Sequence, residues 1–418
     1  MILRRNPVGS SSSTIKPRNM SAVLLMLLRY GRISRVDLAD LTGLSTTTIT
    51  NLVTELIEAG IVAQEDQDQP LGRQRSVGRP RRQLHLVPDA RYALGIHFGV
   101  GSIRVALTDL LAQPIAVDAL EHPLDLPVAE VLAQTGALAQ GLIRRNPQLD
   151  RSHILGLGVG ASGLVDPLTG VNILAPNLNW HDVPLQDYFA SKLHLPVTVD
   201  NNVRAMALGE ALFGVGKDVY SLAFVYARVG VGAGIVVGGR LYYGGGAGAG
   251  EIGHMTILPE GGPRCRCGNS GCLETLISEP VILREAQAIV ERNPGGLLAR
   301  HWREGSGPLI ERVFAAARAG DGASCDLLNR RAHYMGIALA NLVNILNPEL
   351  IVLGGILAQG QDLLLPVIRE TMVQRAFARL GEKVALVPPS FNHQNAGVIG
   401  AAALALNRFF YQHYEGAA

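Results

Sequence analysis

Two segments of the chain share one local pattern, in which an apolar strand, a glycine turn and a second apolar strand follow one another. The first segment is LGIHFGVGSIRVALTD at residues 94–109, and the second is SLAFVYARVGVGAGIVVGGRLYYGG at residues 221–245. A glycine turn of this kind lets backbone N–H groups approach a bound phosphate closely. The duplication predicts two related lobes with a cleft between them.

The chain from Tyr92 onward shows the pattern of an α/β domain. Apolar strand-like runs at 154–166, 196–202 and 348–357 are interspersed with helix-like runs at 128–143, 203–214 and 334–346. At 418 residues the chain is long enough for two or three domains. We therefore expect one large domain at 89–418, with a first lobe of roughly 92–200 plus 393–412 and a second lobe of 201–392.

The composition indicates a folded protein, with 48% hydrophobic and 17% charged residues. The polar N-terminus lacks the apolar stretch of a secretory signal. The most apolar later stretch, residues 221–250, is rich in glycine and contains Arg228 and Arg240, which favours buried strands over a membrane span. Four cysteines do not suggest a disulfide scaffold. We expect a cytoplasmic protein with no membrane partner.

Residues 18–88 are expected to form a winged helix-turn-helix that follows a flexible tail at residues 1–17. Ser34 and Ser45 stand at the N-cap positions of two short helices, and Gly43 marks the turn between them. One apolar face of the second of these helices is formed by Ile49, Leu52, Val53, Leu56 and Ile57. Two helices joined by a glycine turn predict a helix-turn-helix.

The start of that second helix carries short polar side chains suited to base edges and phosphates. The candidate DNA-binding residues there are Ser45, Thr46, Thr47, Thr50 and Asn51. The alternative interpretation is a helical bundle that docks a protein.

A basic wing is expected after the helices, because IVAQ (61–64) and QLHLV (83–87) can pair as two strands. Between them, GRQRSVGRPRR contains five arginines and no acid: Arg73, Arg75, Arg79, Arg81 and Arg82. Residues 1–90 hold twelve Lys and Arg against eight Asp and Glu, net +4, whereas the remainder is net −2. Such a segment can enter a narrow A·T-rich minor groove. A solvated connector is the alternative.

The segment GEIGHMTILPEGGPRCRCGNSGCLE, residues 250–274, contains a candidate metal site. One imidazole and three thiolates, from His254, Cys265, Cys267 and Cys272, form a closed tetrahedral set of the structural zinc type. The alternative is a group of free thiols near a chance histidine. Cys325 lies apart and is expected to be an ordinary buried thiol.

Six motifs together resemble the ROK family of sugar kinases and sugar-responsive repressors. They are ASGLVDPLTG, VDNNVRAMALGE, GAGEIGHM, CRCGNSGC, NPELIVLGG and NAGVIGAAALA, and the resemblance extends over nearly all of residues 92–410. It implies a two-lobed actin/hexokinase-like fold with a sugar in the cleft. The added N-terminal winged helix-turn-helix resembles the repressor branch, of the xylose- and N-acetylglucosamine-repressor type.

The resemblance also implies that three positions important in family kinases are changed. The aspartate of the first phosphate loop falls at His97, the threonine of the second loop falls at Val229, and the catalytic base falls at Asn202. General-base catalysis alone contributes roughly 10²–10⁴-fold to a rate, and phosphoryl transfer also depends on electrostatics at the phosphate loops. We therefore expect no efficient kinase activity.

The sugar-binding positions of the family are better matched. The candidate sugar-binding residues are Gly163, Asn177, Asn201, Asn202, Glu251, His254 and Glu274. Carboxylates accept hydroxyl hydrogen bonds, and an imidazole can donate or accept them. His254 would serve both the sugar and the zinc. The alternative is that Glu251 and Glu274 are ordinary carboxylates of a loop and of a helix start.

The sequence thus predicts a sugar-responsive transcriptional regulator, expected to be a repressor, that binds double-stranded operator DNA as a homodimer or homotetramer. Two alternatives from other classes are an active ROK sugar kinase with an attached DNA-binding domain, and a sensor that docks a protein partner through its N-terminal bundle.

Overall fold

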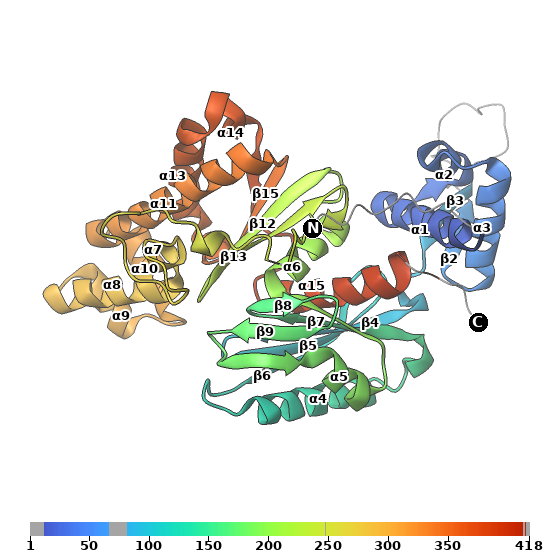
Figure 1. Cartoon of the computed structure of the whole chain (residues 1–418), viewed down its shortest axis with the longest axis horizontal. Helices are drawn as coiled ribbons and strands as arrows, with labels where there is room; N and C mark the ends of the chain where they lie inside the picture. Colours follow the sequence, from blue (N-terminus) through green and yellow to red (C-terminus); the bar gives the residue numbers. More distant parts are fainter. Residues whose placement is uncertain (1–11, 67–81, 247, 413, 415–418) are drawn as a thin grey trace.

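A winged helix-turn-helix forms the N-terminal part of the computed structural model, which describes residues 12–66, 82–246, 248–412 and 414 (Figure 1). Its elements are α1 Ser12–Tyr30, β1 Ile33–Ser34, α2 Arg35–Thr42, α3 Thr46–Glu58, β2 Val62–Asp66 and β3 Arg82–Leu86. The three strands pair antiparallel in the order β1-β3-β2. The predicted helix-turn-helix and the predicted strand pair of the wing are both confirmed.

Local chemistry sets the ends of these helices as the sequence predicts. The Ser34 hydroxyl accepts the backbone N–H of Asp37 and begins α2, and Gly43 ends it in the left-handed conformation. The Ser45 hydroxyl likewise accepts the N–H of Thr48 at the start of α3.

Two predictions for the N-terminal part, the flexible tail and the basic loop, compare with the structure as follows. Helix α1 already begins at Ser12, so residues 12–17 are helical and do not belong to a flexible tail. Of the basic loop, Arg82 is exposed at the start of β3, whereas Arg73, Arg75, Arg79 and Arg81 lie outside the described residues.

The first lobe is built on a five-stranded sheet in the order β11-β7-β4-β5-β6. Its strands are β4 Tyr92–Gly99, β5 Ser102–Thr108, β6 Pro114–Glu121, β7 Ile154–Ala161 and β11 Val197–Asn201. Helices α4 Val128–Arg144 and α5 Leu185–Leu193 cover one face, and α15 Ala396–Leu406 covers the other (Figure 1). A small sheet of β8 Leu164–Asp166, β9 Val171–Ala175 and β10 Trp180–Pro184 lies beside them.

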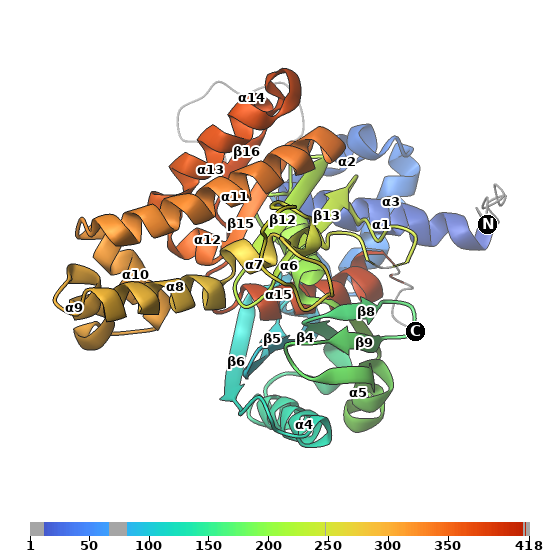
Figure 2. The ribbon, with the colours of Figure 1, turned by 60° about the vertical axis from the view of Figure 1, so that its left-hand side comes forward.

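The second lobe repeats this plan with a sheet in the order β14-β13-β12-β15-β16. Its strands are β12 Ser221–Ala227, β13 Val231–Val237, β14 Arg240–Leu241, β15 Leu350–Gly355 and β16 Ala385–Val387. Its helices are α6 Asn202–Phe213, α7 Glu274–Ile277, α8 Glu279–Arg292, α9 Leu297–Glu304, α10 Leu309–Arg318, α11 Gly322–Leu346, α12 Ile356–Gln359, α13 Gln361–Arg375 and α14 Leu380–Lys383. Figure 2 shows α11 and α13 side by side at the outside of the lobe.

Short helical turns complete the chain. Four are 3-10 turns, η1 Pro88–Ala90, η2 Arg151–His153, η3 Ile252–His254 and η4 Phe377–Arg379, and one is the π-helical turn η5 Asn407–Tyr411. Within the described part of the chain, no helix combines the length and the hydropathy that a membrane crossing requires.

Helix α15 joins the two lobes through contacts that only glycine permits. A Cβ added at Gly158 of β7 would lie 1.8 Å from the carbonyl oxygen of Ala401, and one at Gly95 of β4 would lie 2.4 Å from that of Val398. On its other side, α15 meets α6, where a Cβ at Gly400 would lie 2.7 Å from the backbone of Ala205. The backbone of α15 therefore lies directly on the first sheet and on α6.

The winged helix-turn-helix shares one hydrophobic core with this helix pair. Buried Leu24 and Leu27 of α1 belong to the same cluster as Leu212 and Phe213 at the end of α6 and Phe410 of η5. At the surface, Arg29 of α1 forms an ion pair of 3.1 Å with Asp218. The DNA-binding unit is thus packed onto the helices that join the lobes.

Candidate functional site

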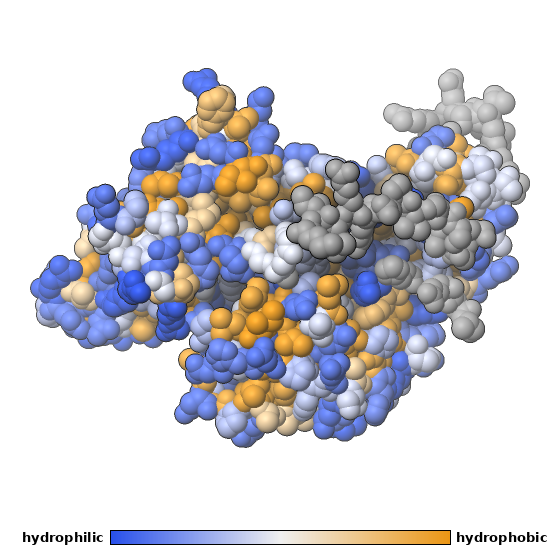
Figure 3. Space-filling view, in the orientation of Figure 1, coloured by the Kyte–Doolittle hydropathy of each residue, from blue (hydrophilic) through white to orange (hydrophobic). Residues whose placement is uncertain are grey.

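The candidate sugar-binding residues come from both lobes, and the surface between the lobes is hollowed (Figure 3). Asn177 follows β9 of the first lobe, and Glu274 begins α7 of the second. A Cβ built at Gly230 would lie 3.3 Å from a carboxylate oxygen of Glu274 and 3.6 Å from the amide nitrogen of Asn177. The glycine therefore leaves open the space that these two side chains share.

The two side chains in this corner are held by different partners. The Glu274 carboxylate accepts the backbone N–H of Val231 at 3.0 Å, and the Asn177 amide oxygen accepts Arg266 Nη1 at 3.0 Å. Arg266 belongs to the cysteine loop of the second lobe, so this hydrogen bond joins the two lobes. The sequence interpretation did not identify Arg266.

The start of α6 places Asn201 and Asn202. Asn201 is the N-cap of the helix: its amide oxygen accepts the N–H groups of Val203 and Arg204, and its amide nitrogen donates to the carbonyl of Gly163. Most of its hydrogen-bonding capacity is thus used within the protein. Gly163 has φ +97 and no room for a Cβ, so its contribution is a backbone carbonyl. Asn202, which is 8% exposed, donates to the Ser162 hydroxyl at 3.2 Å.

Glu251 and His254 lie near Glu274 on the second lobe. Although Glu251 is an exposed residue, the protein around its carboxyl group raises the pKa of that group by desolvation. The charges of His254 and Arg204 act in the opposite direction, and that of Glu274 adds to the rise. Two acceptors and one imidazole therefore stand close together, which suits the recognition of several hydroxyl groups.

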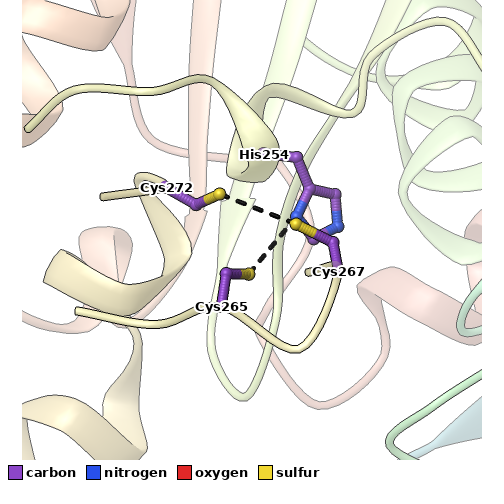
Figure 4. Close-up of side chains that lie close together, drawn as sticks. All are labelled: His254, Cys265, Cys267 and Cys272. Carbon is purple, nitrogen blue, oxygen red and sulfur yellow. Dashed lines mark hydrogen bonds between the residues drawn. The ribbon is translucent and has the colours of Figure 1, made fainter. Parts of the chain in front are cut away.

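The side chains of four potential metal ligands lie close together, as the sequence predicts (Figure 4). The ligand atoms of His254, Cys265, Cys267 and Cys272 all lie within 4.8 Å of one another. The Cys265 sulfur is 3.7 Å from His254 Nδ1, and the sulfurs of Cys267 and Cys272 are 3.7 Å apart. Sulfur ligands at 2.3 Å from a tetrahedral zinc ion are about 3.8 Å apart, so the spacing fits.

The ionisation of these thiols also fits a metal site. Burial, followed by the neighbouring thiols, raises the pKa of Cys272 to about 12. The N–H of Asn269 is the main cause that lowers the pKa of Cys267 to about 7. Three thiols this close cannot all ionise without a compensating cation, and a bound divalent metal supplies that charge. The cluster can therefore bind a metal ion, and Cys325 lies outside it.

Two of the positions compared with kinases, His97 and Val229, lie on different lobes. His97 stands near the end of β4, and its ring packs against Gly397, where an added Cβ would be 2.6 Å away. Burial, followed by the charges of Arg104 and Arg228, lowers the pKa of His97 to about 4, so its imidazole is neutral at pH 7. Val229 follows β12 in the second lobe.

The structure also contains a buried ion pair that the sequence analysis did not predict. Arg204 and Asp200 are each 1% exposed, and the guanidinium Nε donates to the carboxylate at 2.6 Å. Tyr243 of the second lobe donates its hydroxyl to Asp200 at 3.0 Å, and Arg204 also donates to the carbonyl of Val165. This group joins strands β8 and β11 of the first lobe to the loop after β14.

In the DNA-binding unit, all five candidate residues of α3 and its cap are exposed: Ser45, Thr46, Thr47, Thr50 and Asn51. The opposite face of the helix, with Ile49, Leu52, Val53 and Leu56, is buried, whereas Ile57 is half-buried. The polar N-terminal end is therefore available to a partner.

Comparison with known proteins identifies both parts. The ROK family matches residues 93–408, and a winged helix-turn-helix DNA-binding family matches residues 18–63. The chain belongs to the ROK family. It is 33% identical to the xylose repressor of Caldicellulosiruptor bescii over 365 residues, which cover 87% of this chain and 89% of that protein.

Two solved structures extend the comparison. A ROK family transcriptional regulator, described as a homologue of the Escherichia coli Mlc protein, superimposes with a TM-score of 0.80 and 30% identity, covering 95% of this chain and 97% of that one. A ROK glucokinase from Streptomyces griseus, in complex with glucose and AMPPNP, has a TM-score of 0.67 and 27% identity, and covers 76% of this chain and 99% of its own. The full-length match is to the regulator, so this chain is a DNA-binding transcriptional regulator of the ROK family.

The buried pair generates a prediction for the stability of the ROK domain. Arg204→Met leaves Asp200 buried without its cation, and we expect a loss of about 3–5 kcal/mol in the free energy of unfolding at neutral pH. Desolvation already raises the pKa of Asp200, and Arg204 opposes that rise. In the variant the folded-state pKa is higher still than the unfolded value of about 4. The deficit should therefore shrink toward acid pH, where Asp200 is protonated, and grow as the pH rises.

Urea unfolding of both proteins between pH 4.5 and 8 measures this effect. Arg204→Lys, which keeps the charge, serves as the control and should show a smaller and flatter deficit. A deficit for Arg204→Met that does not change with pH would contradict the assignment of the effect to Asp200.

Proposed function

We propose that this chain is a sugar-responsive transcriptional repressor that acts in the cytoplasm, with a ROK domain that binds its sugar without phosphorylating it. The observation that carries the proposal is the position of α6. This helix begins at the cleft with Asn201 and Asn202, and ends in the hydrophobic core that it shares with the DNA-binding unit.

The coupling follows the contacts at the far end of α6. The ring of Phe213 packs on that of Tyr411 in η5 at 6.0 Å, and both α6 and η5 contact α1. A sugar held by Asn177 of one lobe and by Glu251 and Glu274 of the other favours the closed cleft. Closure moves α6, and with it the surface against which α1 packs. The sugar changes DNA affinity only to the extent that it binds the two states with different affinities.

DNA recognition is proposed for the exposed start of α3 in the major groove, with the basic wing on the backbone or the minor groove. One winged unit covers one half-site, so we propose that the protein binds operator DNA as a homodimer or a homotetramer. The Arg-rich loop supplies the charge, with Arg82 at its end.

The function as a whole is tested with operator DNA selected from random duplexes and a panel of sugars. At least one sugar should shift the affinity for the operator, as measured by fluorescence anisotropy. Thr47→Ala and Asn51→Ala should each cost about 1–3 kcal/mol on the operator and much less on scrambled DNA, because they remove base contacts. Thr54→Ala, on the same helix but farther from its N-terminal end, is the matched control.

A regulator that no sugar affects would contradict the sensor function. A protein whose binding to any duplex is insensitive to salt would contradict DNA binding and favour a protein-docking unit.

Catalytic silence is proposed because three groups of the kinase chemistry are replaced at His97, Val229 and Asn202. An amide at 202 cannot take the proton of a sugar hydroxyl, and a neutral imidazole at 97 cannot serve the metal as a carboxylate does. Release of ADP with glucose, xylose and N-acetylglucosamine should stay at background. A turnover number of roughly 1–100 per second would support the alternative, an active kinase with a DNA-binding domain.

Zinc is the proposed metal of the His254 cluster, because three thiolates and one imidazole form a closed tetrahedral set. Purified protein should contain about one zinc per chain by atomic emission. Cys265→Ser and Cys272→Ser should lose the metal. They should also weaken the sugar response, because the cysteine loop leads directly into Glu274, a candidate sugar-binding residue. Cys325→Ser should change neither, and full metal content in the first two variants would contradict this ligand set.

A further inference from the structure

A hydrogen bond to a buried carboxylate crosses from the first lobe to the second at the point where the chain itself passes between them. Asp200 lies in β11 of the first lobe, and α6 begins two residues later, at Asn202. The carboxylate oxygen Oδ2 of Asp200 accepts the hydroxyl of Tyr243 at 3.0 Å, and Tyr243 follows β14 of the second lobe. We call residues 200–202 the crossover. A rotation of one lobe against the other would separate the two ends of this bond.

The Tyr243 side chain is fixed through its ring as well as through its hydroxyl. The guanidinium of Arg204, on α6, lies over the ring at 5.5 Å from its centroid. The same guanidinium donates to Asp200 and to the carbonyl of Val165 in the first lobe. Asp200 and Arg204 are each 1% exposed, so the hydroxyl binds a carboxylate that water hardly reaches. A hydrogen bond to such a charged group is strong enough to shift an equilibrium by about 10- to 100-fold.

Both partners of this hydrogen bond adjoin candidate sugar-binding residues. Asp200 directly precedes Asn201, and its second carboxylate oxygen, Oδ1, accepts the backbone N–H of that residue at 2.7 Å. On the second lobe, the carbonyl of Tyr243 accepts the N–H of Ala249 at 3.3 Å, two residues before Glu251. The bond between Tyr243 and Asp200 therefore ties the segment that leads into Glu251 to the segment that leads into α6.

The preceding residue is also a tyrosine, and it does not share this role. The Tyr242 side chain is exposed, at 52%, whereas Tyr243 is half-buried. Within residues 82–246 and 248–412, the Tyr242 hydroxyl makes no hydrogen bond to another residue. Of these two adjacent tyrosines, only the second forms a side-chain hydrogen bond to the first lobe. The chain thus contains its own control for the loss of a tyrosine hydroxyl at this place.

We propose that Tyr243 is a positioning residue that latches the two lobes across the crossover. Its hydrogen bond to Asp200 stabilises the arrangement of the lobes described above over any arrangement in which the bond is broken. The regulatory consequence rests on the proposed sensor function, since a change of lobe arrangement is the step through which a sugar would act on the DNA-binding unit. The latch sets the equilibrium between the arrangements in the absence of ligand. It thereby sets how strongly a sugar must discriminate between them to change DNA affinity.

The first test needs no ligand and uses hydrogen exchange of the full-length protein, followed by mass spectrometry. Tyr243→Phe removes one oxygen atom and keeps the ring beside Arg204, so the fold is retained. Backbone amides on both sides of the lost bond, at residues 197–205 and 240–246, should exchange about tenfold faster than in the wild type. Tyr242→Phe, the matched control, should exchange like the wild type in both segments. Unchanged exchange in both segments of Tyr243→Phe would overturn the inference.

The second test separates a latch between lobes from a residue that only holds its own loop. The affinity for the selected operator is measured by fluorescence anisotropy, without sugar and with glucose, xylose or N-acetylglucosamine at a saturating concentration. Tyr243→Phe should change the operator affinity by about three- to tenfold in at least one of these two conditions, because it shifts the equilibrium between lobe arrangements. At saturation the sugar site is full in both proteins, so a change in sugar affinity alone cannot produce this result. Tyr242→Phe should match the wild type in both conditions.

The outcomes distinguish failure of this inference from failure of the proposed function. If a sugar shifts operator affinity equally in the wild type and in Tyr243→Phe, and the sugar-free affinities agree, the sensor stands and the latch is wrong. If exchange rises but operator affinity is unchanged in both conditions, Tyr243 only holds its own loop and the latch is again wrong. If no sugar affects the operator, yet Tyr243→Phe changes both the exchange and the sugar-free operator affinity, the latch stands and the sensor function fails.

Discussion

The close contact of α15 with the first sheet and with α6 is the constraint on which the rest of the structure depends. Gly95 and Gly158 remove the side chains that would keep α15 away from the sheet, and Gly400 does the same toward Ala205 of α6. Interiors are close-packed, so even one added methyl group at these places forces backbone to move. The lobes are consequently joined through a helix pair in backbone contact, and a shift of one lobe against the other is a shift of α6 against α15.

This arrangement gives the DNA-binding unit a mechanical link to the cleft. Helix α6 starts at Asn202 and ends against η5 and α1, so one helix reaches from the proposed sugar site to the elements that α1 packs against. The surface pair of Arg29 and Asp218 adds little to this link, because exposed ion pairs contribute at most about 1 kcal/mol. The apolar core around Phe213 and Phe410 is therefore the part that we propose transmits movement.

The parts that could be predicted from the sequence are those with a local signal. Ser34, Gly43 and Ser45 mark helix ends by chemistry within three residues, and the three cysteines of the metal cluster lie within eight residues of the sequence. The roles that depend on tertiary contacts could not be predicted from the sequence. Asn201 matches a sugar-binding position, yet its amide nitrogen donates to the carbonyl of Gly163, 38 residues away in the sequence. Arg204 looks like an ordinary helix arginine in the sequence, but it is buried against Asp200 from the preceding strand.

The proposed sensor function also accounts for the three replaced kinase positions. A kinase must stabilise a transition state more strongly than its ground states. A regulator needs only a ligand that binds the closed state better than the open one, and each turnover would change that ligand into another. Under the proposed function, the replacements at His97, Asn202 and Val229 serve to remove stabilisation of the transition state. Glu251 and Glu274 lie on the second lobe and Asn177 on the first, so a sugar bound as proposed would contact both lobes. A sugar bound in this way would convert binding energy into a shift of conformation.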